Sequence, residues 1–337
     1  MQFLQNISLD ASTSLKMPAT AAWYCEASSV EDVQEAAVFA RDKDIDVLVL
    51  GGGSNLVLGS DVPGLVLANR VAGCEINTDQ SVLGAGENWH DFVSKAVRKE
   101  IGGFENLALI PGNAGAAPMQ NIGAYGVELR DRFISLQAVN LSNGELVTFD
   151  PDACQFGYRD SLFKQSRDWC ITSITLHPSN ELRLEYPGIR SYLDQHQLEP
   201  SHENIFRAVC DVRKSKLPDS ASHPNAGSFF KNPIVSLHRG EEFSRRHPGA
   251  PAYIDSQGVK LSAAWLIDQA GLKGLREGEF SVSDQHALVI VRDGARGMAK
   301  QQGSSFEQLN RLIQRIKDKV LELFGVELEV EPTIYPD

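Results

Sequence analysis

The chain has 337 residues, of which 42% are hydrophobic and 23% are charged, and its formal net charge is −12. This length and composition are typical of a soluble globular protein with two or three domains, and they exclude a disordered chain. The acidic balance argues against a nucleic-acid partner, because phosphate binding requires a basic face.

No apolar run approaches the length that spans a membrane, and the residues after Met1 do not form a basic leader followed by an apolar stretch. We therefore predict a cytoplasmic protein without a membrane partner. The sequence leaves the oligomeric state open, with a monomer favoured.

The first half of the chain alternates helix and strand patterns. Ser29 with Asp32 resembles a helix cap, and apolar residues recur at helical spacing over 33–40. The other elements expected here are strands at 47–50 and 64–67, a helix at 89–97, a hairpin at 133–149 and a strand at 171–176. Asn143-Gly144 favours a tight type I′ turn in that hairpin. This order predicts an α+β fold rather than a series of βαβ units.

A domain boundary is expected near Lys216. After a predicted helix at 204–215, five prolines lie between Lys216 and Asp255, a density that no long helix or central strand tolerates. A second α/β unit follows, with a helix around 263–267 and a strand at 287–291.

The last predicted helix has the clearest pattern. Ser305 and Gln308 are read as its capping box, and Gly325 as its end. Its apolar stripe consists of Phe306, Leu309, Ile313, Ile316, Val320 and Phe324. We expect this stripe to be buried as core rather than to face a partner.

Metal chemistry has no support in the sequence. The five cysteines are scattered, and neither they nor the eight histidines show the spacing of metal ligands. Free cysteines are among the residues most often buried. We predict free, mostly buried thiols and no metal site.

The first candidate ligand loop is Gly51-Gly52-Gly53-Ser54-Asn55-Leu56, which follows a predicted strand. Leu56 does not fit the dinucleotide fingerprint, and no Lys-Ser or Lys-Thr pair completes a P-loop. Two interpretations remain: an ordinary turn, or a nest of backbone amides that binds an anion such as a pyrophosphate.

The second candidate loop covers residues 110–126, with four glycines and two prolines between an apolar run and a charged segment. Glycine allows positive φ and close approach of backbone to a ligand. Gln120, Asn121 and Tyr125 add amide and aromatic groups suited to a flat heterocycle. The alternative is an elaborate Ω-loop without a ligand.

Two polar side chains stand out in otherwise apolar surroundings. Ser228 follows Gly227 in a proline-rich segment with Lys216 and Lys231 nearby, so it is either a turn hydroxyl or a hydroxyl oriented for proton transfer. Arg159 suits a bidentate contact with a carboxylate, or a surface salt bridge.

Five motifs, in order and spacing, resemble the family of UDP-N-acetylenolpyruvoylglucosamine reductases of bacterial peptidoglycan synthesis. The motifs are Leu50 to Leu56, Ile110 to Gly126, Tyr158-Arg159-Asp160-Ser161-Leu162-Phe163-Lys164, Lys216-Leu217-Pro218-Asp219 and Asn225 to Pro233. They extend over essentially the whole chain.

The resemblance implies a two-part FAD-binding region of the vanillyl-alcohol-oxidase type and a smaller α/β substrate domain. The expected FAD subdomains are 1–68, joined by 326–337, and 69–215, and the expected substrate domain is 216–325. The implied cofactor-binding residues are Gly51, Gly52, Gly53, Ser54, Asn55, Leu56, Pro111, Gly112, Gly115, Ala116, Gln120, Asn121, Ile122, Gly123, Ala124 and Tyr125. Neither loop contains the His or Cys to which a flavin could be attached covalently, so we expect noncovalent FAD.

The activity implied by the resemblance is reduction of UDP-N-acetylenolpyruvoylglucosamine to UDP-N-acetylmuramate, with NADPH reducing FAD first. Ser228 would deliver a proton, Arg159 would stabilise the developing negative charge, and Glu331 would support the enol form. The implied substrate-binding residues are Tyr186, Lys216, Asn232 and His286.

The chain departs from the family pattern at a few positions. Pro332-Thr333-Ile334 stands after Glu331 where the family has Val-Arg-Phe, so the family arginine is missing. Two rival interpretations are another FAD oxidase of the same fold and a noncatalytic nucleotide-binding protein. The oxidase interpretation does not explain the segment 225–233. The binding-protein interpretation does not explain why Ser228, Arg159 and Glu331 are all present.

Overall fold

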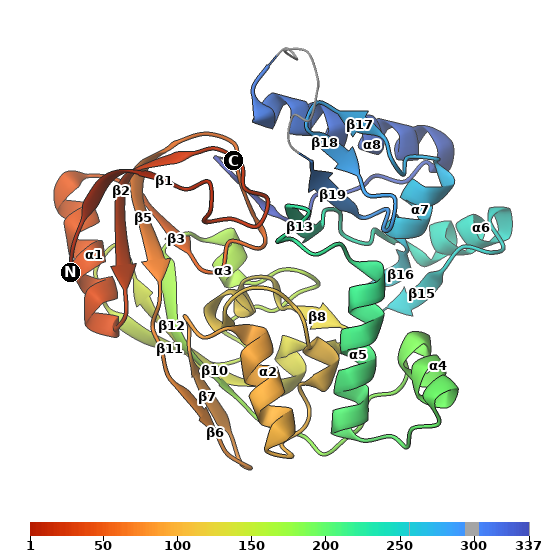
Figure 1. Cartoon of the computed structure of the whole chain (residues 1–337), viewed down its shortest axis with the longest axis horizontal. Coiled ribbons are helices and arrows are strands. Elements are labelled where there is room, and N and C mark those ends of the chain that lie inside the picture. Colours follow the sequence, from red (N-terminus) through yellow and green to blue (C-terminus); the bar gives the residue numbers. More distant parts are fainter. Residues whose placement is uncertain (256, 294–302, 337) are drawn as a thin grey trace. The chain divides into compact units, whose positions relative to one another are not determined.

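The computed structural model describes residues 1–255, 257–293 and 303–336, which form two compact units (Figure 1). The first unit consists of Met1–Leu9, Ala19–Gly53 and Asp61–Ser215. The second consists of Asp10–Pro18, Ser54–Ser60 and the residues from Lys216 onward, so 326–336 group with it. The division into FAD subdomains and a substrate domain stays a prediction.

The first unit contains a four-stranded sheet with the predicted first helix packed on it (Figure 1). In spatial order its strands are β1 (Leu4–Ser8), β2 (Thr20–Ala27), β5 (Val62–Asn69) and β3 (Val47–Leu50). The last three are parallel neighbours, and β1 is antiparallel to β2. The helix α1 (Val30–Lys43) begins where Ser29 Oγ accepts a hydrogen bond from Asp32 N, as predicted.

The second sheet of this unit is antiparallel throughout. Its strands are β11 (Leu146–Phe149), β10 (Phe133–Asn140), β12 (Trp169–Leu176), β7 (Ser81–Gly84) and β6 (Cys74–Ile76). The predicted strands at 133–149 and 171–176 are therefore confirmed.

The turn between β10 and β11 is wider than predicted. A type I′ turn needs positive φ at two residues, and only Gly144 (φ 78°) of the Asn143-Gly144 pair has it. The side chain of Asn140 accepts hydrogen bonds from Ser142 N (2.9 Å) and Asn143 N (3.3 Å). This local side-chain contact stabilises a longer loop, so the type I′ prediction was wrong.

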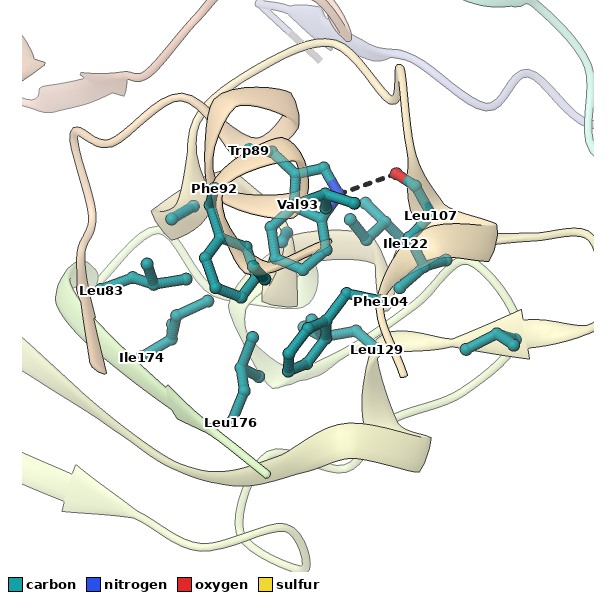
Figure 2. Packing of buried hydrophobic residues seen from close by; sticks show 14 of the residues in the cluster. Leu83, Trp89, Phe92, Val93, Phe104, Leu107, Ile122, Leu129, Ile174 and Leu176 are labelled. Carbon is teal, nitrogen blue, oxygen red and sulfur yellow. Dashed lines mark hydrogen bonds between the residues drawn. The ribbon is translucent and has the colours of Figure 1, made fainter. Parts of the chain in front are cut away.

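The main core of the first unit lies under α2 (Trp89–Arg98), as predicted from its apolar stripe (Figure 2). Figure 2 shows Trp89 and Phe92 packing toward Phe104 and Leu83. The indole Nε1 of Trp89 donates to the carbonyl of Leu107 at 2.9 Å. A buried indole needs such a partner, and here it ties α2 to the segment that leads into the second glycine loop.

The other elements of this unit are short, apart from α5. They are η1 (Glu105–Leu107), η2 (Ala114–Ala116), η3 (Pro118–Gln120), β8 (Gly123–Ala124), β9 (Val127–Glu128), η4 (Leu129–Arg132), α3 (Leu162–Gln165), α4 (Pro187–His196) and α5 (His202–Lys216). The last confirms the helix predicted at 204–215.

A buried polar contact anchors the start of α5. Glu105, 1% exposed, accepts hydrogen bonds from His202 Nδ1 (2.8 Å) and from Gly103 N (2.7 Å). The imidazole has space because residue 102 is glycine: a Cβ there would lie 2.1 Å from His202 Cε1. The contact fixes the helix that carries Arg213 into the candidate site.

The second unit combines small sheets with three helices in the described residues. Its sheets are β13 (Asn225–Ser228), β19 (Val289–Arg292), β18 (Phe280–Val282) and β17 (Arg276–Glu277); β14 (Ile234–Val235), β16 (Gly258–Leu261) and β15 (Ala252–Asp255); and β20 (Thr333–Tyr335) with β4 (Leu56–Leu58). Its helices are α6 (Leu237–Arg246), α7 (Ala263–Gln269) and α8 (Ser305–Phe324). The helix predicted at 263–267 is confirmed, whereas the strand predicted at 287–291 begins only at Val289.

The last helix is capped one residue earlier than predicted. Ser304 Oγ accepts from Glu307 N, and the Glu307 carboxylate accepts from Ser304 N. Ser304 with Glu307 therefore forms the capping box that we assigned to Ser305 and Gln308, because a carboxylate at the helix start also interacts favourably with the helix dipole. Gly325, at φ 67°, ends the helix as predicted.

The cysteines are free, and all but the half-buried Cys74 are buried. Burial raises the pKa of Cys25, Cys154 and Cys170 to about 12. These thiols stay protonated and unreactive at neutral pH. In the part of the chain that the structure describes, no helix is long and apolar enough to cross a membrane.

His90 on α2 supports the backbone before the second glycine loop. Its Nδ1 accepts from the amide of Leu109 at 3.1 Å, and its ring stacks on Phe206 at 5.7 Å. Leu109 has the left-handed φ of 56°, so its conformation depends on such support. Burial lowers the pKa of His90, with Lys214 and Arg213 adding to the effect and Asp91 opposing it.

We predict that His90 destabilises the fold in acid. The native state favours the neutral ring, so its stabilising effect is present above the ordinary pKa of 6.5 and is lost as the pH falls through the lower native pKa. Urea unfolding on both sides of that value should show a smaller acid loss in His90→Asn, whose Oδ1 accepts the same bond without titrating. An equal loss in both proteins would contradict the prediction.

Candidate active site

The two glycine loops meet in the first unit at Gly51 to Gly53. A Cβ on Gly52 would lie 2.8 Å from the Cα of Gly112 and 3.1 Å from Asn113 Oδ1. Such distances leave no room for a side chain, so the loops pack backbone against backbone. The boundary between the units falls after Gly53.

The rest of the first loop belongs to the second unit. Asn55 O accepts from Thr333 N at 3.0 Å, and Leu56 pairs with Thr333 where β4 meets β20. Ser54 O accepts from Ser14 Oγ at 3.4 Å. The structure thus places Ser54, Asn55 and Leu56 with the carboxy-terminal strand rather than with Gly51.

The second loop forms two 3-10 turns, η2 and η3, followed by the short β8 and β9 pair. Gly115 N donates to Ala85 O at 2.9 Å, and a Cβ on Gly115 would lie 2.5 Å from Ala85 Cβ. Asn121 and Tyr125 have positive φ of 43° and 50°. Pro111, Ala116, Gln120 and Ala124 remain at least partly exposed. The loop therefore rests tightly on the end of β7 and presents mainly backbone, which fits the pyrophosphate of a dinucleotide cofactor.

Arg159 lies at a strained turn beside this loop. Its φ is 55°, in the left-handed region that costs a residue with a side chain about 1–3 kcal/mol. Its Nη2 donates to the carbonyl of Gly123 at 2.7 Å, and its guanidinium lies 5.5 Å from the ring centroid of Tyr158. Strain kept in this way is common at functional sites.

The structure adds Arg213, which sequence reasoning missed. The guanidinium lies close to the phenol of Tyr125, and the ring of Tyr125 meets that of Tyr186 edge to face at 4.7 Å. Burial lowers the pKa of Arg213, and the like charge of Arg159 lowers it further, whereas burial raises the pKa of Tyr125. The buried Nε of Arg213 has no hydrogen-bond partner among the described residues.

This arrangement has the chemistry to receive a negatively charged group. Two guanidinium groups influence each other, and a buried donor left without a partner costs about 1–3 kcal/mol. An anionic ligand group would relieve both. In the sequence, Arg213 is one charge on a helix that carries several, so only its burial distinguishes it.

In the second unit, two predicted catalytic residues lie on paired segments. Phe230 forms a β-bridge with Val330, and Glu331 N donates to Phe229 O at 3.0 Å. Ser228 ends β13 opposite Val289, after Gly227 at φ 72°. The sequence around Ser228 is thus brought alongside the segment that contains Glu331.

The structure also describes the predicted residues Asn232, His286 and Lys216. The Oδ1 of Asn232 accepts from Ala263 N at 2.9 Å, so this side chain caps the start of α7. The Nδ1 of His286 accepts from Leu288 N at 3.2 Å, and the carbonyl of Leu288 accepts from Phe229 N. Lys216 is exposed at the end of α5.

Two family models match the chain. One, described as an FAD binding domain, matches residues 21–150. The other, described as the C-terminal domain of UDP-N-acetylenolpyruvoylglucosamine reductase, matches residues 219–335. Both glycine loops lie in the first match, and Ser228 and Glu331 lie in the second.

Relatives named UDP-N-acetylenolpyruvoylglucosamine reductase are similar to this chain over nearly their whole length. The UDP-N-acetylenolpyruvoylglucosamine reductase of Pseudomonas fluorescens is 43% identical, with 98% of each chain covered, and that of Pseudomonas aeruginosa is 42% identical, with 99% of each covered. The crystal structure of the Thermus caldophilus reductase superposes with a TM-score of 0.67 at 26% identity, covering 99% of this chain and 98% of that one.

The protein is therefore an oxidoreductase of the FAD-binding class, with a mixed α and β fold. It belongs to the UDP-N-acetylenolpyruvoylglucosamine reductase family, as its five sequence motifs predicted.

Substituting the two neighbouring glycines should separate loop packing from loop chemistry. Gly52→Ala should lower the unfolding free energy by about 1–3 kcal/mol and reduce FAD content, because its Cβ meets the backbone of Gly112. Gly51→Ala should change stability by about 0.5 kcal/mol or less, since its Cβ would find only ordinary contacts at 3.7 Å. Denaturant unfolding and flavin absorbance measure both effects, and equal losses would refute the packing argument.

Proposed function

We propose that the protein uses NADPH and noncovalently bound FAD to reduce UDP-N-acetylenolpyruvoylglucosamine to UDP-N-acetylmuramate, in the cytoplasm. The observation that carries the proposal is the pairing of the Ser228 and Glu331 segments through Phe230 and Val330 in the region matched by the family's C-terminal model. The names of the full-length relatives supply the substrate.

The reaction saturates one carbon–carbon double bond with a hydride and a proton. FAD, held by residues of the two glycine loops, would supply the hydride after its reduction by NADPH. Hydride addition at the terminal carbon of the enolpyruvyl group leaves negative charge on the adjacent carbon, delocalised into the carboxylate. Arg159 stabilises that charge, because its guanidinium is already oriented by Gly123 O and needs little reorganisation.

Ser228 delivers the proton that completes the reduction. A serine hydroxyl is a weak acid, but the carbon that receives the proton is a strong base, so the transfer is downhill. Glu331 supports the enol form by hydrogen bonding. Its backbone is fixed by the bond from its amide to Phe229 O, one residue from Ser228.

Substrate binding is assigned to cations and aromatic rings. Tyr186, which packs on Tyr125, contacts the nucleotide part of the substrate. Arg213 binds an anionic group of the substrate. Further contacts come from Lys216, Asn232 and His286. The buried Nε of Arg213 supports this role, because an anion would supply the partner that the described residues do not.

An anaerobic flavin titration tests the function. NADPH should bleach the visible absorption of the flavin, and only UDP-N-acetylenolpyruvoylglucosamine should restore it. In Ser228→Ala, bleaching by NADPH should proceed normally and recovery should slow about 100-fold or more, because only the second step needs the proton.

The control is Ser222→Ala, which removes an exposed hydroxyl of the same unit and should leave both steps unchanged. Recovery with oxygen alone would favour an oxidase, and absence of bound flavin would favour a binding protein. Equal slowing of both steps in Ser228→Ala would refute the role of Ser228.

Removing the half-buried Arg213 should weaken substrate binding. Arg213→Met should raise the KM for the UDP-linked substrate roughly 10–100-fold, the loss expected for a charge-assisted hydrogen bond of about 1.5–3 kcal/mol. Lys214→Met, an exposed neighbour on the same helix, is the matched control. Steady-state kinetics with equal KM values for the two variants would contradict the assignment.

A further inference from the structure

The turn that carries Arg159 is attached to the second glycine loop on both of its sides. Gly157 N donates to Asp160 O at 2.9 Å and closes a tight turn around Tyr158 and Arg159. Before Arg159, the carbonyl of Gly157 accepts from Asn121 Nδ2 at 3.0 Å. After it, Ser161 Oγ donates to the carbonyl of Met119 at 2.7 Å.

The side-chain amide of Asn121 forms all of its hydrogen bonds within the protein. Asn121 is 0% exposed. Its Nδ2 also donates to Glu128 Oε2 at 2.9 Å, and its Oδ1 accepts from Arg130 N at 3.0 Å. Both hydrogens of the amide nitrogen are therefore used within the protein. The side-chain amide therefore has no hydrogen left to donate to a cofactor, and the predicted cofactor contact of Asn121 would come from its backbone.

Ser161 is equally buried, at 0% exposure. Its hydroxyl has two functions, because it also accepts from Phe163 N at 3.2 Å and so caps α3. One short side chain therefore joins the helix, the turn and the glycine loop.

We propose that Asn121 and Ser161 are positioning residues that fix the strained Arg159 on the glycine loop, so that the loop expected to hold the cofactor and the arginine that stabilises the reaction's charge form one rigid part. The proposal rests on the proposed function for the role of Arg159. The strained φ of Arg159 gives the physical reason: a left-handed arginine persists only when its surroundings hold it there.

The guanidinium of Arg159 donates to Gly123 O, in the same loop that Asn121 and Ser161 hold. The direction of the arginine is thereby coupled to the position of the loop backbone. Stabilisation of a developing charge is effective only when the charged group is in place beforehand.

The test uses Ser161→Ala in the full-length, FAD-loaded enzyme, because Asn121→Ala leaves several buried groups without partners and is expected to fold poorly. Flavin content and the rate of flavin bleaching by NADPH should be unchanged. Recovery with UDP-N-acetylenolpyruvoylglucosamine should slow about 10–100-fold, since displacement of a positioned group by about 1 Å has that effect. Ser166→Ala, which removes an exposed hydroxyl bonded to Asp168, should change neither step.

A second measurement does not depend on activity. Hydrogen exchange at the amides of residues 157–161 should be faster in Ser161→Ala than in the wild type and unchanged in Ser166→Ala. In an Arg159→Lys background, Ser161→Ala should slow recovery no further, because both changes act through the same group.

The outcomes separate the possible failures. Unchanged exchange at 157–161, equal slowing of both flavin steps, or an additive loss with Arg159→Lys would each overturn the proposal. If the wild type never transfers electrons to the UDP-linked substrate, the proposed function fails alone, because faster exchange in Ser161→Ala would still support the attachment of the turn and unchanged exchange would still refute it.

Discussion

The close approach of two backbones, at Gly52 and Gly112, is the constraint on which the two glycine loops of the first unit depend. Any side chain at Gly52 would push the loops apart. The second loop also approaches Ala85 closely, because a Cβ on Gly115 would lie 2.5 Å from the Cβ of Ala85. Once the loop is seated, its carbonyl groups become fixed acceptors, and Gly123 O orients Arg159. The site that we predict for a dinucleotide thus consists mainly of backbone whose position is set by steric exclusion.

In the second unit, backbone pairing rather than steric exclusion positions the predicted catalytic residues. Ser228 and Glu331 are far apart in sequence, yet the bridge between Phe230 and Val330 brings their segments together. Phe229 and Phe230 are almost completely buried, so the polar residue before them is held at the edge of a rigid apolar core. The ion pair between Lys231 and Glu329, at 2.5 Å, adds a second connection between the same segments.

Elements with strong local signals were predictable from the sequence, and long-range contacts were not. The apolar stripes of α1, α2 and α8 predicted these helices correctly, because burial of one helical face produces a periodic pattern of apolar residues. The cap of α8 was misplaced by one residue because Ser304 and Ser305 both precede a suitable partner by three positions. Arg213 was missed since its contact with Tyr125 comes from tertiary packing, and the hydrogen bonds of the Asn121 side chain join segments far apart in the sequence.

The path of the chain between the units limits how the protein can be divided genetically. The segments Asp10–Pro18 and Ser54–Ser60 group with the second unit although they precede most of the first. β20 has β4 as its partner strand, and Asn225 N donates to Ser14 O. A gene fragment that starts at Lys216 would therefore encode a polypeptide in which β20 lacks its partner strand β4 and Asn225 N lacks its acceptor, Ser14 O. Dissection or shuffling of this protein has to keep its amino-terminal segments with its carboxy-terminal half.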